Sequence, residues 1–260
     1  MQINDKVKIS SIIFFVIVLG MIVVTSISVD NKEENSIKFI QLDGNIHLPT
    51  DEYYRFANIE DETLYENLTS AIIKDRLEKH PYVQRVDAIL NENTLSITIY
   101  EKKFESLLMY GNNECLVTED NIKIPKLPLS EKIDYPIISN PLGANEMGEF
   151  ENILSNSDIT TGLKMISTLK LINPDLYENI SEIDLREGRD IVIQFSQFNF
   201  PIVIGRKREI EKIMYLEQLV QSLDNKFLRD GIEYIDLRYS EHIYIGRSVD
   251  NNDDTRGSNS

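Results

Sequence analysis

One stretch of the chain constrains what it can fold into more than any other, because residues 9–29 carry no charged side chain. The centre of this run, Ile12 to Val24, is interrupted only by Gly20. A helix rises about 1.5 Å per residue, so a helix over this run would extend roughly 32 Å, close to the hydrocarbon thickness of a bilayer. The sequence therefore predicts a single transmembrane helix over residues 9–29.

The charges on either side of the run predict its direction. Lys6 and Lys8 precede it, whereas residues 30–34 hold three acids and one lysine. Because positively charged flanks favour the cytoplasmic side, residues 1–8 are predicted to form a cytoplasmic tail. The bulk of the chain would then lie outside the cytoplasm, anchored in the membrane by one pass.

Two alternatives to an anchor are a cleaved signal peptide and a buried core helix. Ser26 and Ser28 are small residues that suit a signal-peptide cleavage site. The apolar run is longer than the usual 7–15 residues of a signal peptide, and this length favours the anchor. Both the anchor and the signal peptide predict that the rest of the chain is exported.

Composition excludes several classes of function for the 260 residues. The chain has 27 Lys and Arg against 43 Asp and Glu, a formal charge of −16, which argues against nucleic-acid binding because phosphates require a basic face. An apolar fraction of 42% is enough to build a core. The single cysteine, Cys115, excludes an intrachain disulfide and a Cys-rich zinc site.

Residues 36–103 show the pattern of a compact α+β unit. A strand-like run ends at the turn Asp43-Gly44-Asn45, and two helical patterns follow, the second of which ends before Pro81. The period then changes to two on either side of Asn91-Glu92-Asn93, which predicts a hairpin. The predicted order of elements is β-α-α-β-β.

Residues 104–247 are predicted to form a larger mixed domain with a mainly antiparallel sheet and two helices. The two helical patterns run from Gly162 to Ile172 and from Glu209 to Phe227. The segment Ile-Asp-Leu-Arg occurs at residues 183–186 and again at 235–238, which predicts two similar strands in one sheet. Residues 140–156 show no clear pattern, and the polar residues 248–260 are predicted to be a disordered tail.

The sequence contains no motif of a known catalytic, nucleotide-binding or metal site. It has no Gly-x-Ser-x-Gly, Walker A, Gly-x-Gly-x-x-Gly or His-Glu-x-x-His segment. The histidines, His47, His80 and His242, lie in different segments without the spacing of metal ligands. We therefore predict no catalytic residue, no cofactor, no metal and no small-molecule substrate, and a protein that works by binding.

The last strand pattern, residues 242–247, is the first candidate for a binding surface. It precedes the predicted disordered tail, so we expect it at a sheet edge, and it contains little charge to repel an added strand. A partner strand would extend the sheet there, with Tyr239 and Tyr244 as aromatic anchors. An ordinary edge covered by the acidic tail is the alternative.

Four segments carry a resemblance to a known family. Residues 40–45 (IQLDGN), 80–86 (HPYVQRV) and 93–102 (NTLSITIYEK) are similar to a POTRA domain, and residues 234–239 (YIDLRY) are similar to a C-terminal strand segment. In this combination the chain resembles the FtsQ/DivIB family of bacterial cell division proteins. Phe104 departs from the family pattern, which commonly has proline there.

The resemblance implies a non-enzymatic scaffold of the inner membrane at the division septum, with a POTRA domain that helps recruitment and a β domain that binds FtsB- and FtsL-like partners. The implied partner surface consists of Arg238, Tyr239, Ser240, Ile243, Tyr244 and, beside the adjoining strand, Arg189. Two other functions stay open at this point, namely a membrane-anchored envelope hydrolase and a POTRA-type export or chaperone component.

Overall fold

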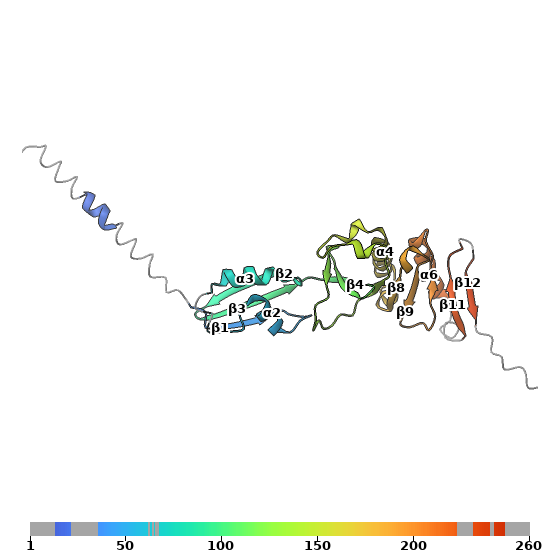
Figure 1. The fold of residues 1–260 in the computed structure, drawn as a ribbon, viewed down its shortest axis with the longest axis horizontal. Helices are drawn as coiled ribbons and strands as arrows, with labels where there is room; N and C mark the ends of the chain where they lie inside the picture. Colours follow the sequence, from blue (N-terminus) through green and yellow to red (C-terminus); the bar gives the residue numbers. More distant parts are fainter. Residues whose placement is uncertain are drawn as a thin grey trace, which may run out of the picture.

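The computed structural model describes residues 14–21, 36–61, 63, 65, 68–222, 231–239 and 242–247. These residues form an elongated molecule in which a three-stranded sheet is followed by a nine-stranded sheet (Figure 1). The last hairpin of the larger sheet forms the end of the molecule that is farthest from the smaller sheet (Figure 1).

The smaller sheet has the strand order β1-β3-β2. β1 (Phe39–Asp43) is parallel to β3 (Thr94–Glu101), and β3 is antiparallel to β2 (Val83–Asn91). Alternate residues of β3 are buried, because successive side chains of a strand point to opposite faces. The buried face therefore lies on the side covered by helices (Figure 1).

Two helices between β1 and β2 provide that cover. α2 (Thr50–Ala57) buries Tyr53, and α3 (Ser70–Glu78) buries Ile73 and Leu77. The Thr69 side chain accepts a hydrogen bond from the N–H of Ile72 and so caps α3. The elements of this half follow the order β-α-α-β-β.

The larger sheet has the strand order β12-β11-β10-β9-β8-β7-β4-β5-β6. Its strands in chain order are β4 (Phe104–Tyr110), β5 (Asn113–Thr118), β6 (Lys123–Pro125), β7 (Ile137–Ser139), β8 (Ile180–Asp184), β9 (Val192–Phe195), β10 (Ile202–Val203), β11 (Ile232–Asp236) and β12 (Tyr244–Arg247). The sheet is mixed, because β4 with β7, β7 with β8 and β10 with β11 are parallel pairs.

The prediction of two helices in this half was incomplete, because a short third helix follows the first. α4 (Ser157–Ile172) and α6 (Glu209–Ser222) cover the sheet, and α5 (Pro174–Glu178) begins directly after α4. Proline is tolerated at the start of a helix, where its missing N–H has no partner to lose. The Asn173 side chain caps α5 by accepting a hydrogen bond from the N–H of Leu176. The Asn-Pro pair thus ends one helix and starts the next.

The structure corrects the prediction of a transmembrane helix over residues 9–29. In that run the described helix covers residues 14–21, and the other positions lie outside the described residues. Throughout the described part of the chain, no helix is both long and apolar enough to cross a membrane. The predicted tails, 1–8 and 248–260, also lie outside the described residues.

Two hydrophobic clusters form the core, and the first crosses from the smaller sheet into the larger one. It contains Tyr53 and Ile97 from the first half together with Phe104, Leu116 and Ile124 from the second. The other cluster lies between the larger sheet and its helices and includes the buried side chains of Leu108, Ile138, Ile166, Ile193, Leu216 and Ile235.

The connection between β6 and β7 ties the two halves together. The Tyr82 hydroxyl accepts a hydrogen bond from the N–H of Leu127 at 2.8 Å and lies 2.8 Å from the Ser130 hydroxyl. The N–H of Glu131 donates to the carbonyl of His47 at 2.8 Å. Because these contacts join side chains and backbone across the boundary between the sheets, they hold the two sheets in one orientation.

Candidate functional site

The candidate site lies at the end of the larger sheet, where β11 pairs antiparallel with β12. Ile235 opposes Ile245, and the N–H of Ile235 donates to the carbonyl of Pro201 at 3.1 Å, on the β10 side. In an antiparallel pair, opposed residues either bond each other or both point away. Ile245 therefore directs its backbone N–H and C=O away from β11, toward the outer edge of β12.

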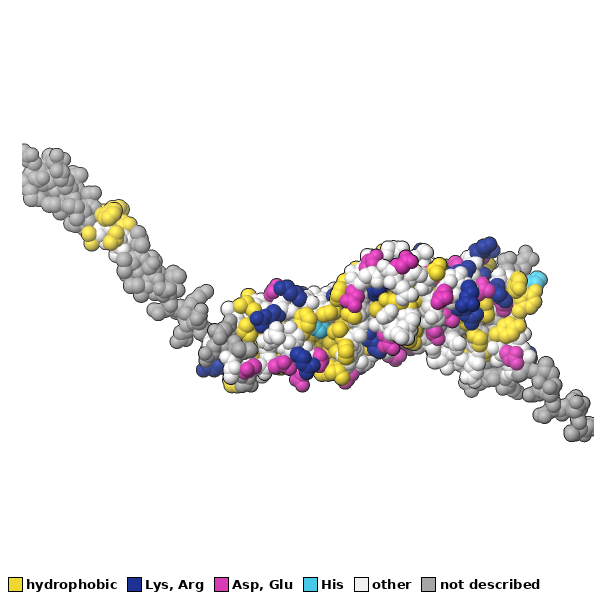
Figure 2. Space-filling view, in the orientation of Figure 1, with side chains coloured by type: hydrophobic (Ala, Val, Ile, Leu, Met, Phe, Trp, Pro, Cys, Tyr) yellow, Lys and Arg dark blue, Asp and Glu magenta, His cyan; other side chains and the backbone are white. Residues whose placement is uncertain are grey.

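Aromatic side chains gather at the turn between these strands. The rings of Tyr239 and Tyr244 lie 5.0 Å apart at an interplanar angle of 68°, and the His242 ring lies 6.3 Å from Tyr244. Tyr239 is 55% exposed and Tyr244 is 49% exposed. Figure 2 shows hydrophobic side chains gathered at this end of the molecule. Large exposed apolar side chains grouped in this way are typical of a surface that binds another protein.

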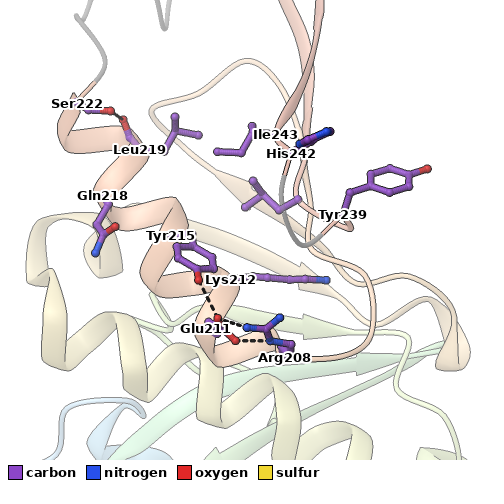
Figure 3. A pocket seen from close by; sticks show the side chains of 11 residues that line it. Arg208, Glu211, Lys212, Tyr215, Gln218, Leu219, Ser222, Tyr239, His242 and Ile243 are labelled. Atoms are coloured by element: carbon purple, nitrogen blue, oxygen red, sulfur yellow. Dashed lines mark hydrogen bonds and ion pairs between the residues drawn. The ribbon is translucent and has the colours of Figure 1, made fainter.

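A cavity of about 580 Å³ lies between α6 and the terminal hairpin (Figure 3). Leu219 from α6 and Ile243 from the hairpin point toward one another across it (Figure 3). Tyr215, Leu237 and Tyr239 also line it. Polar side chains such as Gln218 and Ser222 also line the cavity, but apolar atoms make up most of its exposed wall.

The cations that line the cavity are bound by the chain itself. Arg208 forms an ion pair with Glu211, which also accepts a hydrogen bond from the Tyr215 hydroxyl at 2.8 Å. Hydrogen bonds from Arg208 and Tyr215 lower the pKa of Glu211. Lys212 is buried and donates to the carbonyl of Ile204 at 2.8 Å, and burial lowers its pKa. The cavity is therefore suited to apolar groups and not to an anion.

Arg238 holds the base of the hairpin. Its guanidinium donates to both oxygens of Asp236, at 2.7 to 3.0 Å, and to Asp190 at 2.8 Å. Burial raises the pKa of Asp236, but the hydrogen bonds from Arg238 outweigh burial and leave that pKa below its ordinary value. The same bonds raise the pKa of Arg238. Because Asp190 precedes β9 and Asp236 ends β11, Arg238 links two strands that are not neighbours in the sheet.

A glycine makes room for this arginine. Gly205 follows β10 with a φ of +71°, and a Cβ atom there would lie 2.8 Å from Cγ of Arg238. Glycine adopts this backbone conformation without the steric cost that a side chain would impose. The absence of a side chain at Gly205 therefore lets the Arg238 side chain pack directly against the turn after β10.

The structure brings together most of the residues predicted for partner binding. Tyr239, Ile243 and Tyr244 lie at the hairpin turn, next to Arg238. Ser240 lies outside the described residues. The Arg189 guanidinium donates to the carbonyl of Arg186 at 3.1 Å, and it is the neighbouring residue, Asp190, that accepts a hydrogen bond from Arg238.

Sequence reasoning missed the contribution of α6. Its apolar pattern predicts an amphipathic helix through residues that include Ile210 and Met214, but in the structure Ile210 is 36% exposed and Met214 is 48% exposed. Tyr215 and Leu219 line the cavity instead. These two residues are four positions apart and share one helix face, a spacing that could have identified a second apolar face on this helix.

Comparison with known proteins gives one family. The family described as cell division protein FtsQ/DivIB, C-terminal, matches residues 111–238. The match begins after β4 and ends at Arg238, so it includes Arg189 and stops before the aromatic residues of the hairpin turn. No curated protein matches the chain.

Proposed function

Because the chain belongs to the FtsQ/DivIB family of cell division proteins, we propose that it is a scaffold that binds FtsB- and FtsL-like proteins by adding a partner strand to β12. The family gives the chain a role in cell division at the septum, among non-enzymatic proteins that interact with other division proteins. The proposal adds the partners and the kind of contact.

The observation that carries the proposal is the outer edge of β12. Ile245 directs its N–H and C=O outward, and β12 has a strand neighbour on one side only among the described residues. An edge strand with unpaired backbone groups is a template for another strand unless charge or proline blunts it. The described residues 242–247 contain no proline, and Arg247 is their one permanently charged side chain.

The surroundings of the edge supply side-chain contacts for the same partner. Tyr239 and Tyr244 offer exposed aromatic rings, and the cavity beside Ile243 offers an apolar space. Buried aromatic anchors in such pockets contribute most of the binding energy in many interfaces. In this proposal Ser240 belongs to the same surface, and Arg189 acts through its neighbour Asp190.

The division of labour between the two halves is part of the proposal. Residues 36–103 are proposed to form a POTRA domain that helps recruitment, and residues 104–247 to form the β domain that binds the partner. The element order β-α-α-β-β in the first half supports this assignment. The continuous hydrophobic cluster around Phe104 connects the recruiting half to the binding half.

A proline at Ile245 tests strand addition directly. Proline removes the N–H that faces outward and leaves the hydrogen bonds between β11 and β12 in place, whereas Ile245→Val keeps the N–H. The full-length chain and both variants are compared for capture of the FtsB- and FtsL-like proteins of the same organism. We expect Ile245→Pro to lose binding and Ile245→Val to keep it.

A second variant tests the aromatic surface. Tyr239→Ala removes a ring that is more than half exposed, so we expect weaker capture without a change in thermal stability. If folded Ile245→Pro and Tyr239→Ala both capture the partners as well as the wild type does, the proposed site is wrong.

A further inference from the structure

The two outer edges of the nine-stranded sheet differ, because the chain covers the edge opposite to β12. The N–H of Lys123 in β6 donates to the carbonyl of Glu151 at 3.0 Å, and the N–H of Phe150 donates back to the carbonyl of Lys123 at 2.9 Å. Ile122 and Asn152 oppose each other as an antiparallel bridge. A short segment, residues 148–153, thus occupies the place where another strand would add.

The rest of the β6 edge offers no donor to a partner. Pro125 has no N–H, and the central residue of β6, Ile124, pairs with Leu116 on the β5 side. Just before β6, the carbonyl of Asn121 accepts a hydrogen bond from the N–H of Ile153 at 2.9 Å. The only outward donor of the strand, that of Lys123, is the one that Glu151 occupies.

The segment that covers β6 is fixed at both ends. The Glu151 carboxylate accepts a hydrogen bond from the N–H of Gly148 at 2.7 Å, which closes the turn. The Lys123 ammonium is buried, and it donates to the carbonyl of Met147 at 2.8 Å. The Ile153 side chain is completely buried in the core. These contacts keep the segment on the edge as a permanent part of the fold.

We propose that residues 148–153 are an edge cap that restricts strand addition on the larger sheet to β12, so that this sheet binds one partner strand. Unpaired edges invite pairing with other chains, and natural proteins cover or blunt the edges they do not use. The stoichiometry of one partner strand rests on the proposed function. The cap itself does not, because it concerns contacts within the chain.

Phe150 offers a matched pair of variants. Its side chain is 51% exposed and its φ is +60°. Phe150→Pro removes the N–H and excludes the positive φ, whereas Phe150→Gly keeps the N–H and tolerates the positive φ. Both variants lose the same aromatic side chain, so the difference between them reports the combined loss of the N–H and of the positive φ with which this residue pairs with β6.

We expect Phe150→Pro to speed amide exchange at Lys123 roughly tenfold relative to Phe150→Gly, which corresponds to the loss of about one hydrogen bond. We also expect the proline variant to self-associate with increasing concentration, measured by size-exclusion chromatography with light scattering. Equal exchange and equal mass for the two full-length variants would overturn the cap.

Measurements on the wild type keep the test decisive if the proline variant does not fold. The amides of Lys123 and Ile153 should exchange as slowly as those of the central strands, and fast exchange at both overturns the cap. With the FtsB-like protein as probe, one partner strand per chain supports the inference, and two overturn it. A probe that does not bind at all refutes the proposed function, and amide exchange still decides whether the cap exists.

Discussion

The ring of Tyr234 lies across Gly246, its partner on the neighbouring strand. A Cβ atom at Gly246 would come within 2.3 Å of Cε1 of Tyr234. The absence of a side chain at Gly246 thus lets an aromatic ring cover the edge strand, and cross-strand pairs of this kind stabilise two-stranded ribbons. β11 is the only strand neighbour of β12 among the described residues, so contacts across this pair hold β12 to the sheet.

We therefore predict an unfavourable coupling between a side chain at Gly246 and the tyrosine at 234. Gly246→Ala should lower the free energy of unfolding by about 1 kcal/mol more in the wild type than in a Tyr234→Ala background, where the ring is gone. Denaturant unfolding of the four proteins of this double-mutant cycle measures the coupling free energy. A coupling free energy of zero would show that the ring does not cover the glycine.

The second prediction concerns Arg238, which we expect to stabilise the hairpin. Arg238→Gln leaves the buried carboxylate of Asp236 without its main donor, so the free energy of unfolding should fall by about 1–3 kcal/mol at pH 7. The pKa of Asp236 is lowered in the folded state, so its contribution is present at neutral pH. This contribution is lost as the pH falls below about 4, where the carboxyl is protonated in the unfolded chain and then in the folded one.

Urea unfolding at several pH values tests this prediction. The stability difference between the wild type and Arg238→Gln should shrink as the pH falls. Asp190→Asn serves as the control, because it weakens the other, more exposed bond of Arg238 and leaves Asp236 paired. A difference that does not depend on pH would mean that Asp236 is not the group that Arg238 stabilises.

Local patterns in the sequence were sufficient for the elements whose contacts are local. The change to period two on either side of residues 91–93 corresponds to the β2–β3 hairpin, in which Glu92 takes a positive φ. The repeated Ile-Asp-Leu-Arg segments end β8 and β11, and in each the aspartate accepts a hydrogen bond from the backbone N–H of the following arginine. The hairpin and the aspartate-to-arginine hydrogen bond each involve residues that are close together in the chain.

Long-range pairings could not be read in this way. Residues 140–156 had no pattern of their own because their partners are distant, as when the N–H of Lys123 donates to Glu151. Asp190, just before β9, and Arg238, just after β11, are also distant in the sequence, and they meet beside the intervening strand β10. The cavity needs both α6 and the hairpin, and neither element alone indicates that its apolar face lines a space. The apolar pattern of a helix does not distinguish a residue that lines a cavity from one that is packed in the core.

A third prediction compares two buried serines on neighbouring strands. Ser106 in β4 is completely buried, and its hydroxyl is the one buried side-chain polar atom among the described residues without a hydrogen-bond partner. Ser139 in β7 is also buried, but it donates to the Glu182 carboxylate. Ser106→Ala should leave the free energy of unfolding unchanged or raise it by up to about 1 kcal/mol, since an unpaired hydroxyl is removed.

The matched change, Ser139→Ala, should lower the free energy of unfolding by about 1–2 kcal/mol because it breaks a hydrogen bond to a charged group. Thermal and urea unfolding of the two variants are compared directly. If Ser106→Ala proves as destabilising as Ser139→Ala, then the Ser106 hydroxyl has a partner in solution.

The last prediction concerns His80, which lies in the core beside α2 and is 3% exposed. Its ring contacts those of Tyr53 and Phe56, and its Nδ1 accepts a hydrogen bond from the N–H of Tyr82 at 3.1 Å. Burial, with a smaller contribution from the charge of Lys102, lowers the pKa of His80 to about 4. The imidazole is therefore neutral in the folded protein at neutral pH.

In the unfolded chain the same group has a pKa of about 6.5, so between pH 6.5 and 4 the unfolded state binds a proton that the folded state does not. The contribution of the neutral His80 to the free energy of unfolding should therefore be fully present above pH 6.5. The free energy of unfolding should decrease by roughly 3 kcal/mol as the pH falls toward 4. His80→Asn keeps an acceptor for the N–H of Tyr82 and does not titrate. Its stability should start lower, because the ring contacts are lost, but should vary less between pH 6.5 and 4. Parallel pH profiles for the two proteins, from urea unfolding, would exclude His80 as the source of the acid sensitivity.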